Sequence, residues 1–499
     1  MMDIDDILII GAGVSGIGMA CHLARSHPGL KVRVVERRAA MGGTWDLFRY
    51  PGVRSDSDMF TYGYQFRPWQ ELKVLSDGPS IKAYIEDTAR DYRVHDKVSF
   101  GLKAEAARWS SREGLWDVEF LHEASGERRH LRCRFLINAT GYYDFDRGHA
   151  PEFAGMDRYQ GQLIHPQHWP EHFSCAGKRV VIIGSGATAV TLAPTLAQDA
   201  AHVTMLQRSP TYMMSLLGHD KLSEWLLRVL PKSWVYGMAR RRNLALGRFI
   251  YRFARRHPQR MRRFLLGHVM RRLDGKVDQA HFTPRYQPWD ERLCVVKDGD
   301  LFTSLREGRV EVLTDEIASF TRSGLRLKSG QELEADIVIT ATGLQLQTLG
   351  GMRLLVDGQE KKLADLLSYK ATLLQDVPNF AWLFGYINAS WTLKVDLSAA
   401  YLCRLISHMK AHGAEICTPR APAGEALDAS VMSALSSGYV KRSSDLLPRQ
   451  GRHLPWRVTN DYLADQALLL RTPVADPALE LTSTQTKEIP EHDRNPVLV

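Results

Sequence analysis

The stretch Asp6-Ile-Leu-Ile-Ile10-Gly11-Ala-Gly13-Val-Ser-Gly16 joins a short apolar run to a glycine-rich loop. The run has the composition of a buried parallel strand, and residues 17–25 continue as a helical stretch. A second strand, residues 31–36, ends in an acid 20 residues after Gly16. This order is typical of a dinucleotide-binding βαβ unit, in which a pyrophosphate approaches the helix N-terminus and the acid binds ribose hydroxyls. The residues predicted to hold this first nucleotide are Gly11, Gly13, Ser15, Gly16 and Glu36.

A second glycine loop, Gly184-Ser-Gly186-Ala-Thr-Ala189, follows the apolar run 180–183. Its last glycine is replaced by alanine, which the helix–strand contact tolerates. The strand 202–207 ends in Gln207, at the position that Glu36 holds after the first loop, and Arg208 follows. An acid would repel a 2′-phosphate, whereas a neutral Gln followed by Arg accommodates one. We therefore expect FAD at the first loop and NADPH at the second, where it is held by Gly184, Ser185, Gly186, Ala187, Thr188, Arg208 and Ser209.

Three shorter motifs extend the two nucleotide sites. In flavoproteins with two dinucleotide sites, a turn at this distance after the first glycine loop runs past the flavin, and Met41-Gly-Gly43-Thr-Trp45 stands at that position. An ordinary turn fixed by the Trp side chain explains these residues equally well. Ala-Thr-Gly occurs twice, each time at the end of an apolar strand and after its own glycine loop. In flavoproteins of this class, the tripeptide marks the crossing between nucleotide domains. The residues added to the prediction are Gly43, Thr44, Trp45, Ala139, Thr140, Gly141, Ala341, Thr342 and Gly343.

The composition is that of an ordinary globular protein, with 44% hydrophobic and 24% charged residues in a chain of 499. No uncharged apolar run reaches the roughly 18 residues that span a bilayer, and the acidic N-terminus does not resemble a secretory signal. The six cysteines are scattered without a Cys-x-x-Cys spacing. We therefore predict no metal site, and we exclude a disulfide reductase, which needs a cysteine pair after the first loop. Reduced thiols favour a cytoplasmic location.

The net charge of +9 is concentrated in one segment. Residues 221–272 contain 15 Lys or Arg, interleaved with apolar and aromatic residues, and a single acid, Glu224. This pattern predicts two or three amphipathic helices inserted in the second nucleotide domain. A helical subdomain with a solvated basic face is the simplest explanation, and peripheral attraction to anionic lipids at the inner face of the cell membrane is the alternative. Nucleic-acid binding is not expected, because no recognition motif accompanies the charge.

Between the loops lies Tyr159-Gln-Gly-Gln-Leu-Ile-His165-Pro-Gln-His-Trp169-Pro170. Its glycine frees the backbone and its prolines stiffen it, which suits a linker, although a surface loop can have the same composition. The spacing aromatic-x-Gly-x-x-x-His-x-x-x-Trp-Pro resembles the fingerprint of type I (class B) Baeyer–Villiger monooxygenases. These flavin enzymes insert one oxygen atom of O2 beside a ketone carbonyl, and flavin-containing monooxygenases carry a similar string that ends in Phe or Tyr. The fingerprint residues are Tyr159, Gly161, His165, Trp169 and Pro170.

Residues 49–58, 288–294 and 385–392 resemble the mycobacterial subgroup of this family that activates thioamide drugs. The resemblance runs from about residue 5 to residue 465. It implies that Arg292 is the active-site arginine, that Asp56 lies near the flavin and nicotinamide, and that Asn388 lies at a helix start beside the flavin. One departure is Glu291, which stands where the family has a lysine that helps to hold the NADPH phosphate.

The resemblance also implies the activity. It predicts an enzyme that uses NADPH and O2 to convert ketones into esters or lactones through a flavin C4a-peroxide, with sulfoxidation as a side reaction. Arg292 would stabilise the peroxide anion and pair with Asp56, and His165 and Trp169 would couple NADPH binding to domain closure. The alternative is a flavin-containing monooxygenase that oxygenates N or S, against which the Trp-Pro ending of the fingerprint argues. A small ketone or a thioether-like molecule is the expected substrate.

The expected fold is α/β, with two Rossmann-like domains and a helical insertion in the second. An FAD domain built from both ends of the chain encloses an NADPH domain, and a tail with little periodicity is expected to be mobile or wrapped on the surface. The predicted limits are 1–145 and 341–465 for the FAD domain, 146–175 for the linker, 176–215 and 285–340 for the NADPH domain, 216–284 for the basic insertion and 466–499 for the tail.

Overall fold

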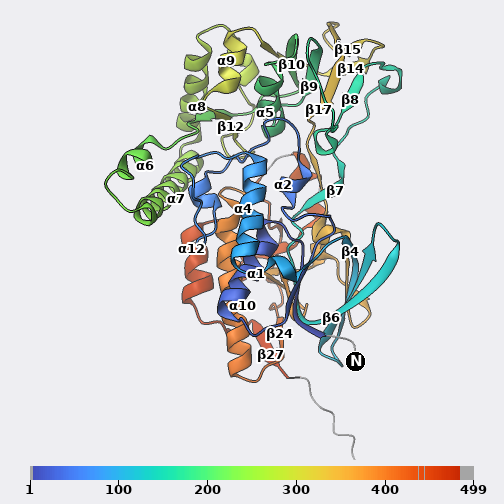
Figure 1. The fold of residues 1–499 in the computed structure, drawn as a ribbon, viewed down its shortest axis with the longest axis vertical. Helices are drawn as coiled ribbons and strands as arrows, with labels where there is room; N and C mark the ends of the chain where they lie inside the picture. Colours follow the sequence, from blue (N-terminus) through green and yellow to red (C-terminus); the bar gives the residue numbers. More distant parts are fainter. Residues whose placement is uncertain (1–3, 436–437, 443, 484–499) are drawn as a thin grey trace, which may run out of the picture.

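The computed structural model describes residues 4–435, 438–442 and 444–483, and two sheets with covering helices lie one above the other (Figure 1). In the lower sheet, β1 (Ile4–Ile10) runs parallel to both of its neighbours, β2 (Val32–Val35) and β6 (Glu127–Asn138). α1 (Val14–Ser26) follows β1 directly. Alternate residues of β1 face two core clusters on opposite sides of the sheet, as the two-residue period of a strand requires. The first βαβ unit is thereby confirmed.

The upper sheet has five parallel strands in the order β13-β10-β9-β17-β8. Its centre repeats the first unit, since the strand with the glycine loop pairs directly with the strand that ends in Ala-Thr-Gly, as β1 pairs with β6 below. The expected fold class, α/β with two Rossmann-like units, is confirmed. The elements are β8 (Gln162–Ile164), β9 (Arg179–Ile183), α5 (Ala187–Leu196), β10 (His202–Gln207), β13 (Val310–Thr314) and β17 (Ile337–Thr340).

The fingerprint segment adds a strand to the upper sheet, which the linker interpretation did not include. β8 lies at the edge of this sheet and pairs with β17 through Gln162, Leu163 and Ile164. The apolar run that precedes the second Ala-Thr-Gly needs a partner for its backbone groups on this side, and the fingerprint segment supplies it. The domain limits given above stay a prediction.

The rest of the lower unit supports the first nucleotide loop. β4 (Leu102–Ser110) and β5 (Leu115–His122) form an antiparallel meander with β6. α4 (Gly78–Asp91) and α10 (Trp391–Ala411) cover α1. α10 begins at Trp391, three residues after Asn388, and its first turns bury Lys394 and Asp396.

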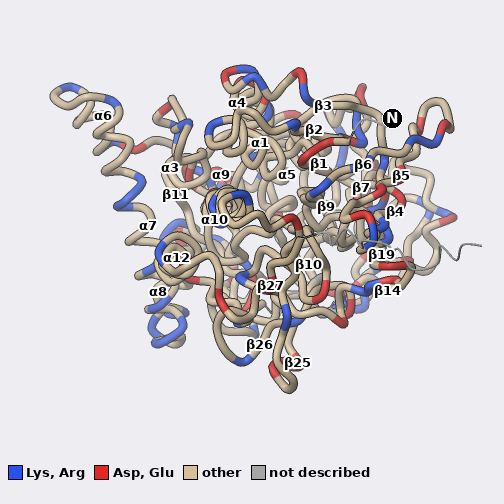
Figure 2. The backbone as a smooth tube through the Cα atoms, turned by 90° about the horizontal axis from the view of Figure 1, so that it is seen from below, with Lys and Arg blue, Asp and Glu red and all other residues tan. Residues whose placement is uncertain are grey.

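The basic insertion leaves and re-enters the upper unit at one place. β11 (Met213–Leu216) and β12 (Cys294–Lys297) form a parallel pair at its base. Between them lie three helices, in agreement with the expected two or three, and Figure 2 shows many of the basic residues along them. They are α6 (Lys221–Leu226), α7 (Lys232–Arg256) and α8 (Pro258–Leu273).

The first half of the tail packs on the surface, which is one of the two states expected of it. α12 (Tyr462–Gln466) continues into a π-helix, Ala467–Arg471, and β27 (Leu479–Thr482) pairs with β24 (Ile416–Pro419). Arg404 of α10 donates to two backbone carbonyls of this segment, which fixes it on the helix. Few apolar residues are needed for such backbone contacts, so periodicity did not reveal them. Residues 484–499 lie outside the described residues.

No helix in the described part of the chain is long and apolar enough to cross a membrane. The remaining elements are α2 (Thr44–Leu47), α3 (Met59–Tyr62), β3 (Val98–Ser99), β7 (Tyr143–Gly148), α9 (Asp300–Arg306), β14 (Ile317–Phe320), β15 (Gly324–Leu327), β16 (Glu332–Glu334), β18 (Leu344–Leu346), β19 (Arg353–Val356), β20 (Gln359–Glu360), β21 (Ser368–Tyr369), β22 (Leu373–Leu374), β23 (Phe380–Trp382), β25 (Ala426–Ser430), α11 (Gly438–Lys441) and β26 (Arg449–Gly451), together with short 3-10 turns.

Candidate active site

A cavity of about 1620 Å³ is lined by residues of both nucleotide units and of α7. The lower unit contributes the loop after β1 and the end of β6, and the upper unit contributes the start of α5 and the segment before β12. A concave site of this size between two domains is the usual place for cofactors and substrates. The predicted residues on its wall are Gly11, Gly13, Ser15, Glu36, Gly43, Thr44, Trp45, Asp56, Ala139, Thr140, Gly141, Thr188, Arg292 and Asn388.

The glycines after β1 are required by close backbone contacts. Gly11 has φ +102°, and a Cβ there would lie 2.7 Å from the carbonyl oxygen of Ala139. A Cβ on Gly16 would lie 1.8 Å from the carbonyl oxygen of Gly11. Gly13 instead faces Gly43 across the loop, with 3.5 Å between its ideal Cβ position and the Gly43 Cα. Gly11 and Gly16 therefore shape the turn, whereas Gly13 leaves room at the cavity wall for a ligand.

Glu36 is buried at the end of β2 and is held by the glycine loop. Its two carboxylate oxygens accept hydrogen bonds from the backbone N–H groups of Ala12, at 2.7 Å, and Arg38, at 2.9 Å. Burial raises the pKa of Glu36, and these two hydrogen bonds oppose that rise. The carboxylate is thus fixed on the cavity wall, where its contact with a ribose stays a prediction.

The turn at 42–45 lies against the first glycine loop. Gly42 and Gly43 both have positive φ, at +121° and +56°, and Thr44 begins the short helix α2. The indole N–H of Trp45 donates to the hydroxyl of Tyr62 at 2.7 Å. Trp45 therefore fixes the turn, as expected of an ordinary turn. The turn also lies on the cavity wall beside the first glycine loop, as expected of a turn that passes the flavin.

Residues 49–58 connect the two nucleotide units. A Cβ on Gly52 would lie 2.5 Å from Oγ1 of Thr195 in α5, so this glycine permits close approach to the upper unit. Arg54 is buried and donates from Nη1 to Asp300 of α9 at 2.9 Å. Within the described residues, its Nε and Nη2 have no hydrogen-bond partner. The segment thus places two free donor groups near the cavity, in a position that suits an anionic ligand.

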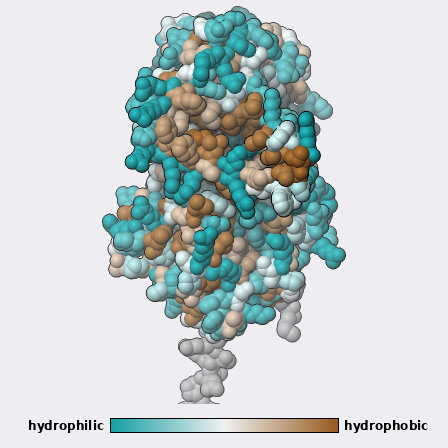
Figure 3. Space-filling model, turned by 90° about the vertical axis from the view of Figure 1, so that its left-hand side faces the viewer, coloured by the Kyte–Doolittle hydropathy of each residue, from teal (hydrophilic) through white to brown (hydrophobic). Residues whose placement is uncertain are grey.

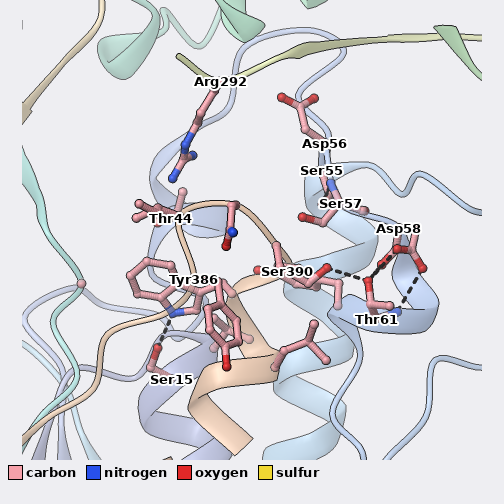
Figure 4. Close-up of a pocket in the computed structure, with 18 of the residues that line it drawn as sticks. Ser15, Thr44, Ser55, Asp56, Ser57, Asp58, Thr61, Arg292, Tyr386 and Ser390 are labelled. Atoms are coloured by element: carbon pink, nitrogen blue, oxygen red, sulfur yellow. Dashed lines mark hydrogen bonds between the residues drawn. The ribbon is translucent and has the colours of Figure 1, made fainter. Parts of the chain in front are cut away.

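Arg292 and Asp56 enter the cavity from different units, as Figure 4 shows. The guanidinium Nη2 of Arg292 donates to the hydroxyl of Tyr142 at 3.1 Å. The carboxylate of Asp56 is accessible from the cavity, although protein surrounds it. This enclosure raises the pKa of Asp56 to about 6, against the opposing charges of Arg54 and Arg292. The structure therefore brings the two predicted residues together, while their roles stay predictions.

The raised pKa of Asp56 predicts that kcat/KM for oxygenation decreases at acidic pH. Because the pKa of Asp56 is about 6, its carboxylate is ionised above this pH and loses the charge that faces Arg292 below it. We expect kcat/KM for oxygenation to fall as the pH is lowered through about 6, measured between about pH 5 and 9. In Asp56→Asn this decrease should be absent and the rate lower at every pH. An unchanged decrease in the variant would contradict the assignment.

Tyr142 is a residue that the sequence analysis missed, although it follows the first Ala-Thr-Gly. Its ring is buried and stacks on Trp391 with 5.3 Å between ring centroids, and its hydroxyl meets both Arg292 and the hydroxyl of Tyr143. Trp391 in turn donates from its indole N–H to Ser15 Oγ at 2.8 Å (Figure 4). Tyr142 therefore links the arginine to the first nucleotide loop, a contact that no local motif signals.

The residues at the start of α10 also line the cavity. Their polar groups suit a flavin. Asn388 donates to the carbonyl of Asn460 at 3.1 Å, while its Oδ1 is buried without a hydrogen-bond partner in the described residues. Ser390, the residue before α10, and Thr61 share a hydrogen bond of 2.6 Å between their hydroxyls. A helix N-terminus favours electron-rich groups. The open polar atom and the gap beside Gly13 fit FAD in this part of the cavity.

The second glycine loop repeats the geometry of the first. Gly184 has φ +139°, and a Cβ there would lie 2.3 Å from the carbonyl oxygen of Ala341. Each first glycine thus abuts the alanine of its own Ala-Thr-Gly, which explains why the two motifs occur together. Ser185 Oγ donates to the carbonyl of Ser209 at 3.0 Å and closes the loop. Among the described residues, no atom lies within 4 Å of the ideal Cβ position of Gly186.

Arg208 and Ser209 are exposed beyond the end of β10. Gln207 is fully buried and donates from Nε2 to the carbonyl of His281 and to Thr314 Oγ1, so it does not face a nucleotide. Apart from Thr188, the predicted second-site residues lie outside the large cavity. They are Gly184, Ser185, Gly186, Ala187, Arg208, Ser209, Ala341, Thr342 and Gly343.

The fingerprint residues lie where the two units meet. A Cβ on Gly161 would lie 2.2 Å from the hydroxyl of Tyr159, which donates to the carbonyl of Ala335 at 2.9 Å. The His165 ring packs on Gly148 of β7, and burial lowers its pKa. Trp169, followed by Pro170, packs against Phe173 at the core of the upper unit. None of these residues lines the cavity, so the structure offers them no direct contact with the substrate there.

A family model described as pyridine nucleotide-disulphide oxidoreductase matches residues 5–235. All six cysteines are buried and free. The match therefore reflects the nucleotide-binding units. A solved structure of a steroid monooxygenase bound to NADP covers 96% of this chain and 100% of its own, with a TM-score of 0.78 and 21% sequence identity. At that identity the likeness establishes the fold.

Two curated relatives are much closer in sequence. MymA of Mycobacterium tuberculosis is 55% identical over 482 residues, which cover 96% of this chain and 97% of MymA. The FAD-containing monooxygenase EthA of Mycolicibacterium smegmatis is 46% identical over 479 residues, which cover 96% of this chain and 97% of EthA. Identity at this level extends over both nucleotide units and the insertion. The chain therefore belongs to the family of FAD-containing monooxygenases.

Proposed function

We propose that this FAD-dependent monooxygenase uses NADPH and O2 to insert one oxygen atom next to a ketone carbonyl, which gives an ester or a lactone. The observation that carries the proposal is the convergence of Arg292 and Asp56 on the cavity that the FAD loop lines. Ketone chemistry is supported further by the Trp169-Pro170 ending of the fingerprint. Sulfoxidation of thioether-like substrates is proposed as a side activity of the same site.

Bound FAD, once reduced, supplies the electrons that let O2 react with a closed-shell organic molecule. The protein then has to stabilise negative charge at the reacting oxygen and to exclude water. Arg292 suits the first task, because a guanidinium stays charged and presents several donors in fixed directions. Tyr142 positions it through the hydrogen bond of 3.1 Å, and Asp56 balances its charge.

His165 and Trp169 are proposed to act on domain movement. Their side chains lie at the junction of β7, β8 and the upper core, away from the cavity wall. Burial keeps His165 neutral at pH 7, because it lowers the pKa below the ordinary value. A rigid contact at this junction can transmit NADPH binding at the second loop to the closure of the cavity.

NADPH is proposed to bind at the second glycine loop, with its 2′-phosphate on Arg208 and Ser209. Charge-assisted hydrogen bonds contribute about 1.5–3 kcal/mol each. We therefore expect Arg208→Ala to raise the KM for NADPH about 10- to 100-fold and to change that for NADH little, since NADH lacks the phosphate. Steady-state NADPH and NADH oxidation measures this, with the exposed Arg326→Ala in the same unit as the control. Equal rises for both nucleotides would contradict the assignment.

The second candidate reaction is oxygenation of N or S in soft nucleophiles, which requires the same two nucleotide units. The two are separated by incubating the purified yellow protein with NADPH, 18O2 and parallel panels of ketones, thioethers and amines. An ester or lactone with one labelled oxygen is the expected product. Labelled sulfoxide or N-oxide, with every ketone unchanged, would replace the proposed reaction by the second one.

We also propose that the enzyme works in the cytoplasm, with residues 221–272 in peripheral contact with the inner face of the cell membrane. The 15 basic residues of this segment against one acid support the contact. The substrate is proposed to be a small molecule, and nucleic acid is not proposed as a partner.

A further inference from the structure

Large apolar side chains are exposed on the part of the insertion farthest from the sheets. α6, the turn after it and the first part of α7 form an arm, residues 221–249, that reaches away from the sheets in two perpendicular views (Figures 1 and 2). Single exposed apolar residues are common, but a run of them in one projecting element marks an interaction surface. The apolar tip of the arm consists of Leu222, Trp225, Val229, Trp234 and Met238, with Trp225 58%, Val229 69% and Trp234 66% exposed.

In the sequence, basic residues stand between the residues of the apolar tip. Lys221, Arg228 and Lys232 are exposed and form no ion pair within the described residues. The single acid of the segment, Glu224, lies 3.4 Å from the imidazole of His219. An arm that exposes tryptophan together with unpaired lysine and arginine matches a bilayer surface, where indole rings sit at the headgroup level and cations meet anionic lipids.

The opposite face of α7 is fixed to the lower unit, so the exposed face cannot turn inward. The hydroxyl of Tyr236 donates to the carbonyl of Phe60 at 2.8 Å. The buried guanidinium of Arg240 donates to the carbonyls of Phe60 and Gly63 at 2.8 and 2.9 Å. Such buried, charge-assisted contacts set the rotation of the helix about its axis. Trp234 and Met238, the part of the apolar tip on α7, therefore stay directed to solvent.

Part of the cavity wall on α7 lies on the same side of the helix as Trp234 and Met238. Positions 234, 238, 241, 245, 249, 252 and 256 recur at intervals of three and four residues, so they share one side of the helix. Arg241, Ala245, Phe249, Arg252 and Arg256 in this series are exposed and also line the cavity. Figure 3, which views the molecule from this side, shows apolar side chains gathered among hydrophilic ones in the upper half. The exposed part of the cavity wall on α7 thus lies on the side of the helix that carries Trp234 and Met238.

We propose that this face docks on an anionic lipid bilayer, with the apolar tip inserted among the headgroups and the cavity mouth turned to the lipid. The substrate then reaches the cavity from the bilayer and is a lipophilic ketone with an extended apolar part. The docking follows from the arm alone, whereas the substrate class rests on the proposed function. Charge complementarity selects the bilayer as the occupant, since Lys221, Arg228 and Lys232 have no acidic partner among the described residues.

Flotation of the full-length flavoprotein with vesicles tests the docking. Phosphatidylcholine vesicles that contain phosphatidylglycerol should carry the protein, and pure phosphatidylcholine vesicles should carry at least about tenfold less. The tip variant W225A/W234A and the charge variant K221E/R228E/K232E should each lose about tenfold or more. The matched control R112E/K178E/K410E removes equal charge from exposed positions outside the arm and should bind like the wild type.

Three outcomes would overturn the docking. The wild type could ignore anionic vesicles, the control could lose binding as the charge variant does, or light scattering could show a dimer that the tip variant converts to a monomer. The last result would make the surface an interface between two copies of the chain. Circular dichroism of each variant confirms that the fold is retained, so that a loss of binding reports the surface.

The substrate class is tested by comparing a long-chain ketone dissolved in the vesicles with a short, water-soluble ketone. Neither Trp225 nor Trp234 lines the cavity, so the tip variant should oxygenate the soluble ketone at the wild-type rate. For the vesicle-dissolved ketone its kcat/KM should fall about tenfold. Equal rates for both enzymes on both ketones would overturn delivery from the bilayer. A wild type that oxygenates neither ketone but still binds vesicles would defeat the proposed function alone.

Discussion

Replacing Arg292 with alanine is expected to abolish ketone oxygenation and to leave the reduction of FAD by NADPH near the wild-type rate. The guanidinium enters the cavity from the segment before β12, whereas the second glycine loop, apart from Thr188, lies outside this cavity. Loss of one preorganised donor at a developing anion lowers kcat by about 10²- to 10³-fold. NADPH consumption should then continue with hydrogen peroxide as the product. Stopped-flow reduction of the flavin, and product analysis by mass spectrometry, measure the two steps separately.

Two further variants make this result specific. Arg292→Lys keeps the charge without the forked donors and should recover only part of the activity. Tyr142→Phe removes the hydroxyl that holds Arg292 at 3.1 Å and should cost about tenfold or less, with peroxide release raised. Ester formation at the wild-type rate in Arg292→Ala would refute the role of this residue. Equal losses in flavin reduction and in oxygenation would show a structural effect instead.

The second large effect is expected at Gly13. Its φ of −77° suits alanine, and the nearest atom to an ideal Cβ, the Gly43 Cα, lies 3.5 Å away. Gly13→Ala should therefore fold, but the methyl group occupies the space through which a pyrophosphate approaches the start of α1. Lost hydrogen bonds of about 1.5–3 kcal/mol each weaken FAD binding by about 10²-fold or more. The purified variant should be nearly colourless, which its flavin-to-protein absorbance ratio measures.

Gly186→Ala in the second loop is the matched control. This glycine has φ −79° and open space around its ideal Cβ, so the substitution is equally mild for the fold. It should leave the protein yellow and raise the KM for NADPH. Gly16→Ala, in contrast, brings a Cβ within 1.8 Å of a backbone oxygen and should lower the melting temperature. A yellow Gly13→Ala protein with weak NADPH binding would mean that the two cofactors occupy the opposite loops.

The sequence by itself determined the two nucleotide units and their cofactor-facing loops. Strand, glycine turn and helix are consecutive in the chain, so their spacing reports their geometry directly. The sequence also indicated that each Ala-Thr-Gly belongs to a glycine loop. The structure gives the reason, because Gly11 lies against the carbonyl of Ala139 and Gly184 lies against the carbonyl of Ala341. The basic insertion was recognisable from charge alone, because its composition differs from that of the rest of the chain.

Only the tertiary structure decided which distant residues meet. Arg292 and Tyr142 are 150 positions apart, and Arg54 and Asp300 are 246 apart, so no local spacing relates them. The place of the first half of the tail was decided in the same way, since its strand pairs with β24 and its helical turns are held by Arg404 through backbone carbonyls. The direction of Trp234 and Met238 likewise depends on the buried contacts of Arg240 with the lower unit. Periodicity reports which residues share a face, but packing across the chain determines what that face meets.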